Sequence, residues 1–198
     1  MIAKISATKN LGGALGYNFK KVKREEASIL LTQGLYQNKE ERYTMAEVFA
    51  DMQALIPEKC RTKKMVFHCS LNPHPDEKLS DETLTQIAKE YMEALGYDKQ
   101  PYIVFKHSDI AREHIHIVSL RVNGEGKKIN DKFEKRRSKK ITDSLERKYN
   151  LIPSSKIADK VMNETPKIDT TRGNIKEQVA SVLPVSYTHL TLPTNREV

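Results

Sequence analysis

The sequence has few cysteines and no long apolar run. Its 198 residues contain only Cys60 and Cys69, which match neither a C-x-x-C pair nor a zinc-finger spacing. We therefore expect free thiols and a reducing compartment rather than a disulfide framework. No apolar stretch approaches the roughly 20 residues that cross a bilayer, and the run at residues 1–5 is too short for the apolar core of a signal peptide. These absences favour a cytoplasmic protein without a membrane span.

A Walker phosphate-binding loop is also missing. Residues 10–19 contain three glycines, but no Gly-Lys-Ser/Thr ending follows them. Glycine lets the backbone approach a ligand closely, and a helix beginning near Ala14 would point its first N–H groups at a phosphate. Such a helix places Tyr17 in its first turns. Because the other tyrosines before residue 150 lie on apolar helix faces, in strands or at element ends, Tyr17 is the candidate catalytic tyrosine, with a structural role as the alternative.

The charge is unbalanced toward basic residues. The sequence has 34 lysines and arginines against 26 aspartates and glutamates, which gives a formal net charge of +8. This excess favours a polyanionic partner, of which nucleic acid is the commonest, over a bland basic surface. For the individual basic residues, a solvated basic face is an equal interpretation. The candidate phosphate-binding residues are Arg121, Lys127, Lys128, Arg136 and Arg137.

Strand and helix patterns alternate through the first 150 residues. Apolar and β-branched runs predict strands at residues 1–6, 27–32, 64–71, 101–106 and 115–122, and helical spacing predicts helices at residues 14–22, 44–56, 80–95 and 141–149. Thr44 and Glu47 form a capping box, and Ser80 and Gly96 mark the start and end of the third helix. An antiparallel hairpin with helices packed on one face indicates an α+β fold.

The sequence divides into three parts. Residues 1–151 form the expected domain, and residues 152–184 are polar and without periodicity, as in a linker or the start of a further C-terminal region. Residues 185–198 look like the conceptual translation of a sequencing adapter, so we exclude Tyr187 and His189 from the site candidates. The natural protein is then expected to be longer.

Three of the six histidines lie within ten residues. His114 and His116 alternate with Ile115 on a predicted strand, so both must point to the same face. The six residues between His107 and His114 suit a hairpin loop, which returns His107 beside His114. Three imidazoles at a sheet edge can hold a metal and leave coordination positions open for water or substrate. The alternative is a half-buried strand face that binds nothing.

The chemistry expected of such a site is phosphodiester cleavage. A metal held by imidazoles acts as a Lewis acid, and a phosphodiester is the obvious electrophile for a basic protein. The nucleophile is either metal-activated water or a side chain that forms a covalent intermediate. Asp109, two residues after His107, can accept a hydrogen bond from an imidazole N–H and fix its tautomer, or can be a turn residue.

Three motifs resemble the relaxase or mobilisation nuclease domain of MobA/VirD type, from conjugative plasmids and integrative elements. They are the Leu-Gly-Tyr that ends at Tyr17, the His-x-Ser-Leu that begins at His68 with its polar turn, and the His-x-Asp-x4-His-x-His that begins at His107. The last contains the His-hydrophobic-His signature of the HUH endonuclease superfamily. The resemblance extends over about residues 1–151 and implies a five-stranded antiparallel sheet with flanking helices.

The same resemblance implies a reaction. Tyr17 attacks a phosphodiester at the nick site of single-stranded origin-of-transfer DNA, forms a 5′-phosphotyrosyl bond and releases a 3′-hydroxyl. His107, His114 and His116 hold Mg²⁺ or Mn²⁺, with Zn²⁺ as a further possibility, Asp109 assists, and relaxosome accessory proteins are the expected partners. His68 is expected beside the site rather than as a fourth ligand. Two alternatives stay open, a rolling-circle replication initiator of the same superfamily and a non-catalytic DNA-binding accessory protein with structural zinc.

Overall fold

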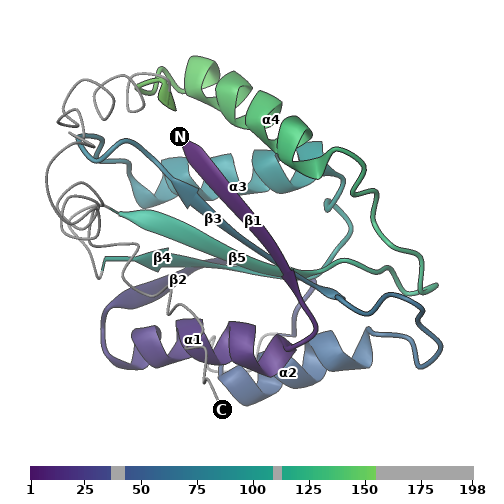
Figure 1. The fold of residues 1–198 in the computed structure, drawn as a ribbon. Helices are drawn as coiled ribbons and strands as arrows, with labels where there is room; N and C mark the ends of the chain where they lie inside the picture. Colours follow the sequence, from purple (N-terminus) through teal and green to yellow (C-terminus); the bar gives the residue numbers. More distant parts are fainter. Residues whose placement is uncertain (37–42, 109–112, 155–198) are drawn as a thin grey trace, which may run out of the picture. The chain divides into compact units, whose positions relative to one another are not determined.

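A computed structural model describes residues 1–36, 43–108 and 113–154 as one unit built on a five-stranded antiparallel sheet (Figure 1). The strand order is β1-β3-β5-β4-β2, so β1 and β2 form the edges and β5 lies at the centre. The elements are β1 (Ile2–Thr8), α1 (Leu11–Lys23), β2 (Ala27–Gln33), α2 (Met45–Ala54), β3 (Val66–Asn72), α3 (Asp81–Leu95), β4 (Tyr102–His107), β5 (His114–Leu120) and α4 (Glu134–Lys148). The predicted α+β class with an antiparallel five-stranded sheet and flanking helices is confirmed.

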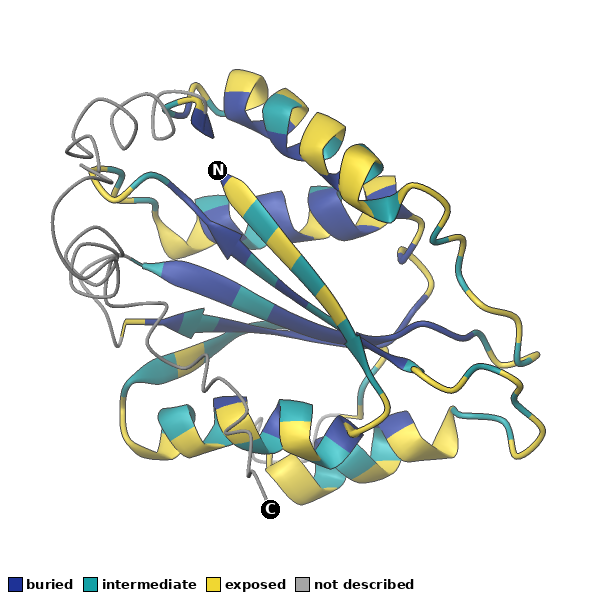
Figure 2. Ribbon diagram, viewed as in Figure 1, coloured by how far each residue is buried: buried dark blue, intermediate teal, exposed yellow. Residues whose placement is uncertain are grey.

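The helices cover both faces of the sheet, two on each. One core packs under α1 and α2 and includes Leu15, Val48 and Phe105, while the other packs under α3 and α4. The expectation that the helices pack on one face was therefore wrong. The reason is visible in the central strands, which are buried along nearly their whole length (Figure 2). A sheet that is apolar on both sides must be covered on both sides.

The predicted caps are present. Thr44 accepts a hydrogen bond from the backbone N–H of Glu47, and the Glu47 carboxylate accepts one from the Thr44 N–H at 3.1 Å, which completes a capping box. Helix α3 begins after Ser80 and ends at Gly96, whose φ of 87° lies in the left-handed region that favours glycine. These local signals determine where α2 and α3 begin and where α3 ends.

Helix α4 begins seven residues earlier than the sequence predicted, at Glu134 instead of residue 141. Its buried face contains the polar residues Ser138 and Thr142 as well as Leu145. The apolar periodicity is therefore weak in the first half of the helix, where most residues are lysine or arginine. Lysine and arginine are good helix formers, and packing against α3 supplies the rest.

Among the described residues, no helix is both long enough and apolar enough to cross a membrane.

Candidate metal centre

The β4–β5 hairpin brings three histidines together. His107 at the end of β4 is the direct cross-strand partner of His114 at the start of β5, as the motif spacing predicted. His116 lies two residues along β5 on the same face, opposite Phe105. One nitrogen from each of the three imidazoles lies within 4.8 Å of the others, and the ring centroids are 4.3 to 5.2 Å apart. This spacing can accommodate one metal ion.

The surroundings of the triad keep at least one imidazole neutral. His107 is fully buried and His114 is 7% exposed. Burial, followed by the neighbouring His107, lowers the pKa of His116 to about 2. The pKa is depressed because a charged imidazolium would lose its hydration and face other basic groups. A neutral imidazole keeps a nitrogen lone pair, which is the form that binds a cation.

Tyr17 lies beside the triad although it is ninety residues away in sequence. Its ring centroid is 6.0 Å from that of His107 and 6.1 Å from that of His116. The side chain is 50% exposed, so a substrate in solvent can reach it. The amino group of Lys21, one turn further along α1, lies 5.4 Å from the centre of the tyrosine ring. The site therefore combines a reachable phenol, the ammonium group of Lys21 and three imidazoles that could hold a metal ion.

Helix α1 begins at Leu11, three residues before the predicted start. Asn10 caps it by accepting a hydrogen bond from the Gly13 N–H at 2.7 Å. Tyr17 is consequently in the second turn, about 9 Å along the axis from the first helical residue. The helix N-terminus does not lie at the tyrosine, so the predicted use of its N–H groups for a phosphate beside Tyr17 does not fit this geometry. The buried stripe of Leu11, Leu15 and Asn18 anchors the helix to the sheet and leaves Tyr17 at its margin.

Two further residues contact the triad: Asn18, which the sequence did not single out, and His68, which was expected beside the site. Asn18 is fully buried, and its side-chain oxygen lies 2.8 Å from Nε2 of His107. His68 on β3 places its Nε2 3.0 Å from Nδ1 of His116, with the two rings stacked. The signal for Asn18 was a polar residue on the apolar stripe of α1, and the signal for His68 was its place in the His-x-Ser-Leu motif.

Asp109, predicted to fix a histidine tautomer, lies outside the described residues.

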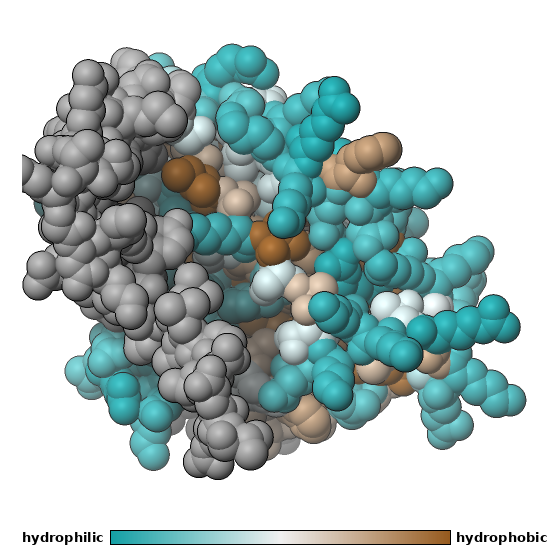
Figure 3. Space-filling model, viewed as in Figure 1, coloured by the Kyte–Doolittle hydropathy of each residue, from teal (hydrophilic) through white to brown (hydrophobic). Residues whose placement is uncertain are grey.

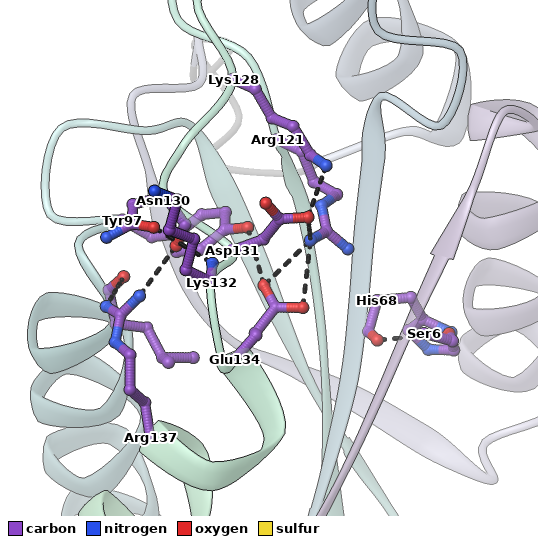
Figure 4. Close-up of polar contacts among 11 residues, drawn as sticks. Ser6, His68, Tyr97, Arg121, Lys128, Asn130, Asp131, Lys132, Glu134 and Arg137 are labelled. Carbon is purple, nitrogen blue, oxygen red and sulfur yellow. Dashed lines mark hydrogen bonds and ion pairs between the residues drawn. The ribbon is translucent and has the colours of Figure 1, made fainter.

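Arg121 is not available to DNA. Its side chain is 6% exposed and is held by the Glu134 carboxylate at 3.0 Å and the Asp131 carboxylate at 3.1 Å (Figure 4). The Tyr97 hydroxyl also donates to Glu134, at 3.5 Å. This buried network joins the end of β5 to the start of α4, so the predicted role of Arg121 in binding phosphate was wrong. The sequence does not distinguish the two roles, because a guanidinium forms the same kind of hydrogen bonds with carboxylates and with phosphates.

The other four predicted DNA contacts lie beyond the far end of β5. A seven-residue strand spans about 20 Å, and His114 and Leu120 stand at its opposite ends. Arg137 donates to the backbone carbonyls of Asn130 at 2.8 Å and Leu95 at 2.9 Å, so it caps the C-terminus of α3 (Figure 4). Of the remaining three, Lys128 pairs with Asp131, Lys127 is exposed near Glu125, and Arg136 is exposed.

A different group of basic residues lies close to Tyr17. Lys20, Lys21 and Lys23 occupy the last turn of α1, and Arg24 follows as its C-cap. Lys20, Lys23 and Arg24 are exposed. Basic side chains also suit this position because they complement the negative end of the helix dipole. They are the positive charges on the same helix as the tyrosine, within two turns of it.

One comparison with known proteins found a match. The family model described as relaxase, MobA/VirD2-like, nuclease domain matches residues 17–151, which is well over half of the chain. A comparison with curated proteins found no match. The matched segment begins at Tyr17 and includes the three histidines of the hairpin.

Proposed function

Because this chain belongs to the MobA/VirD2-like relaxase family and carries its nuclease domain, we propose that it nicks one DNA strand by forming a covalent bond to Tyr17. The substrate is single-stranded DNA at an origin of transfer, and the biological role is mobilisation of the DNA element that carries it. The observation that carries the proposal is the position of a half-exposed tyrosine ring 6.0 Å from one imidazole of the triad and 6.1 Å from another.

The proposed reaction is a transesterification. The Tyr17 hydroxyl loses its proton and attacks phosphorus, the bond to the 3′-oxygen breaks, and that oxygen takes up a proton as it leaves. The products are a 5′-phosphotyrosyl bond and a free 3′-hydroxyl, so the bond energy is kept for rejoining the strand. His107, His114 and His116 would hold a divalent cation, which would supply positive charge to offset the negative charge that grows on the phosphate. The Lys21 amino group, 5.4 Å from the centre of the tyrosine ring, places a further positive charge beside the nucleophile.

The nature of the donor atoms bears on the choice of cation. The described triad offers three nitrogens, whereas Mg²⁺ prefers oxygen ligands. Of the cations that the sequence suggested, we therefore propose Mn²⁺ over Mg²⁺, with Zn²⁺ as the alternative. A structural zinc site alone would give no reason for an exposed tyrosine at its edge.

We also propose that DNA phosphates contact the last turn of α1. Lys20, Lys23 and Arg24 are exposed there, and they lie on the helix that carries the nucleophile. Phosphate contacts fix the register of a nucleic acid on a protein. Contacts at this turn would hold the strand so that its scissile phosphate lies near Tyr17.

The test is an adduct assay with a labelled single-stranded oligonucleotide that carries the nick site, with Mn²⁺ present or chelated. We expect the protein and the control variant Tyr36→Phe to form a covalent protein–DNA adduct that needs the metal. Tyr36 is 70% exposed, and among the described residues its ring does not pack against any of the three histidines, so Tyr36→Phe removes a phenol without touching the site. Tyr17→Phe should form no adduct, and an adduct with that variant would show that another group is the nucleophile.

A further inference from the structure

Two of the three histidines in the triad have a polar side chain against one ring nitrogen. For His107 this partner is Asn18, which sits next to Tyr17 and is fully buried. The Asn18 amide nitrogen donates to the backbone carbonyl of Ala14 at 2.8 Å. Because a carbonyl can only accept, the amide nitrogen must face Ala14, and the amide oxygen must face His107.

This orientation determines which nitrogen of His107 carries the proton. An amide oxygen cannot donate, so Nε2 of His107, 2.8 Å away, must carry the hydrogen. In the neutral ring that a metal ligand requires, the lone pair is then on Nδ1. The buried amide thus selects one of two tautomers that would otherwise interconvert.

His68 has the same relation to His116. Nε2 of His68 lies 3.0 Å from Nδ1 of His116, and one of these nitrogens must donate to the other. If His116 accepted through Nδ1, its proton would be on Nε2 and neither nitrogen could bind a cation. Metal binding by His116 therefore requires that Nδ1 donates to His68 and that Nε2 holds the lone pair.

We infer that Asn18 and His68 are positioning residues that fix the tautomers of His107 and His116, so that Nδ1 of the first and Nε2 of the second face the cation. The inference rests on the proposed metal site and extends it by two residues from two other elements. Helix α1 thereby carries both the nucleophile and the residue that orients a ligand. Partners of this kind typically change metal affinity by about 10- to 100-fold when they are removed.

Metal affinity is the first readout, measured without DNA by calorimetric titration with Mn²⁺. We expect Asn18→Leu and His68→Phe to bind at least tenfold more weakly than the unmodified chain. His68→Gln keeps an amide oxygen as acceptor and should recover most of the affinity. The matched control is Gln100→Leu, which removes another buried amide, 6% exposed, whose partner, the Val122 carbonyl, lies at the other end of the sheet. The control should bind Mn²⁺ within twofold of the unmodified chain.

The tautomer itself is the second readout. Long-range proton–nitrogen correlation spectra of the metal-free protein report which nitrogen of each imidazole is protonated. We expect His107 to be protonated on Nε2, and Asn18→Leu to show a mixture of both forms while its thermal midpoint stays close to that of Gln100→Leu. A loss of stability alone would not produce this change.

The outcomes separate the inference from the proposed function. Equal Mn²⁺ affinity in the unmodified chain, Asn18→Leu and His68→Phe would overturn the inference and leave the metal site in place. A His107 protonated on Nδ1 would overturn the Asn18 part directly. Binding of neither Mn²⁺ nor Zn²⁺ by the unmodified chain would remove the metal site and the inference together.

Discussion

At the scale of single residues, two cationic side chains have different roles because the fold gives them different partners. Arg121 and Lys21 are both cations near the end of an apolar element, yet Arg121 is buried between two carboxylates and Lys21 lies over the ring of Tyr17. Their chemistry follows from the partners that the fold supplies. A buried ion pair costs free energy when one partner is removed, because the other charge stays desolvated.

We predict that Arg121→Ala lowers the free energy of unfolding by about 3 kcal/mol, the lower end of the range for breaking a buried ion pair. Asp131 keeps Lys128 as a partner, which limits the loss. DNA affinity at a temperature where the variant is folded should not change. Urea unfolding measures the first quantity and fluorescence anisotropy the second. The exposed Arg136→Ala serves as the control and should change stability by less than about 0.5 kcal/mol.

At the scale of elements, helices α3 and α4 are joined by polar contacts as well as by their shared apolar core. Lys148 at the end of α4 lies 2.7 Å from the Glu90 carboxylate on α3, and the Tyr149 hydroxyl donates to the same carboxylate at 2.7 Å. The Lys148 hydrogen bond is the main reason that the pKa of Glu90 lies below its usual value. Because Glu90 is partly exposed, this contact is weak.

The lowered pKa gives a pH dependence with a definite sign. Unfolded Glu90 binds its proton near the ordinary glutamate pKa of about 4.3, whereas folded Glu90 binds it at lower pH. The unfolded state therefore binds more protons in this window, so the contribution is complete above the unfolded pKa and is lost as the pH falls through the folded pKa. Urea unfolding between pH 6 and pH 3 should show a shallower acid loss for Glu90→Gln than for the unmodified chain. An unchanged slope would mean that the pair does not contribute.

At the scale of the whole molecule, the sheet separates two basic regions. The basic turn of α1 lies on the face and at the end of the sheet that hold the triad, whereas Lys127 and Arg136 follow the other end of β5. The view in Figure 3 shows polar side chains over much of the visible surface of the described residues. Net charge alone therefore does not tell where a polyanion binds.

We predict that charge reversal at the two regions has unequal effects on binding of single-stranded DNA. The double variant Lys20→Glu with Lys23→Glu should lose at least tenfold in affinity at 50 mM salt. The slope of log affinity against log salt concentration should become shallower by about 1.4, which is about 0.7 for each phosphate contact removed. The matched variant Lys127→Glu with Arg136→Glu carries the same charge change and should bind within twofold of the unmodified chain. Equal losses would indicate a general electrostatic effect and contradict a path along α1.

Local signals determined much of this protein from its sequence. Alternation placed His114 and His116 on one face, the hairpin spacing paired His107 with His114, and caps set the starts of α2 and α3. These features depend on neighbours in the chain, and periodicity of two or of 3.6 residues records them directly. The tertiary structure decided the rest. It brought Tyr17 and His68 to the hairpin, buried Arg121 against α4, and turned Asn18 toward a ring 89 residues away. Such contacts depend on strand order and on which face of the sheet each helix covers. The spacing of residues along the chain determines neither of these.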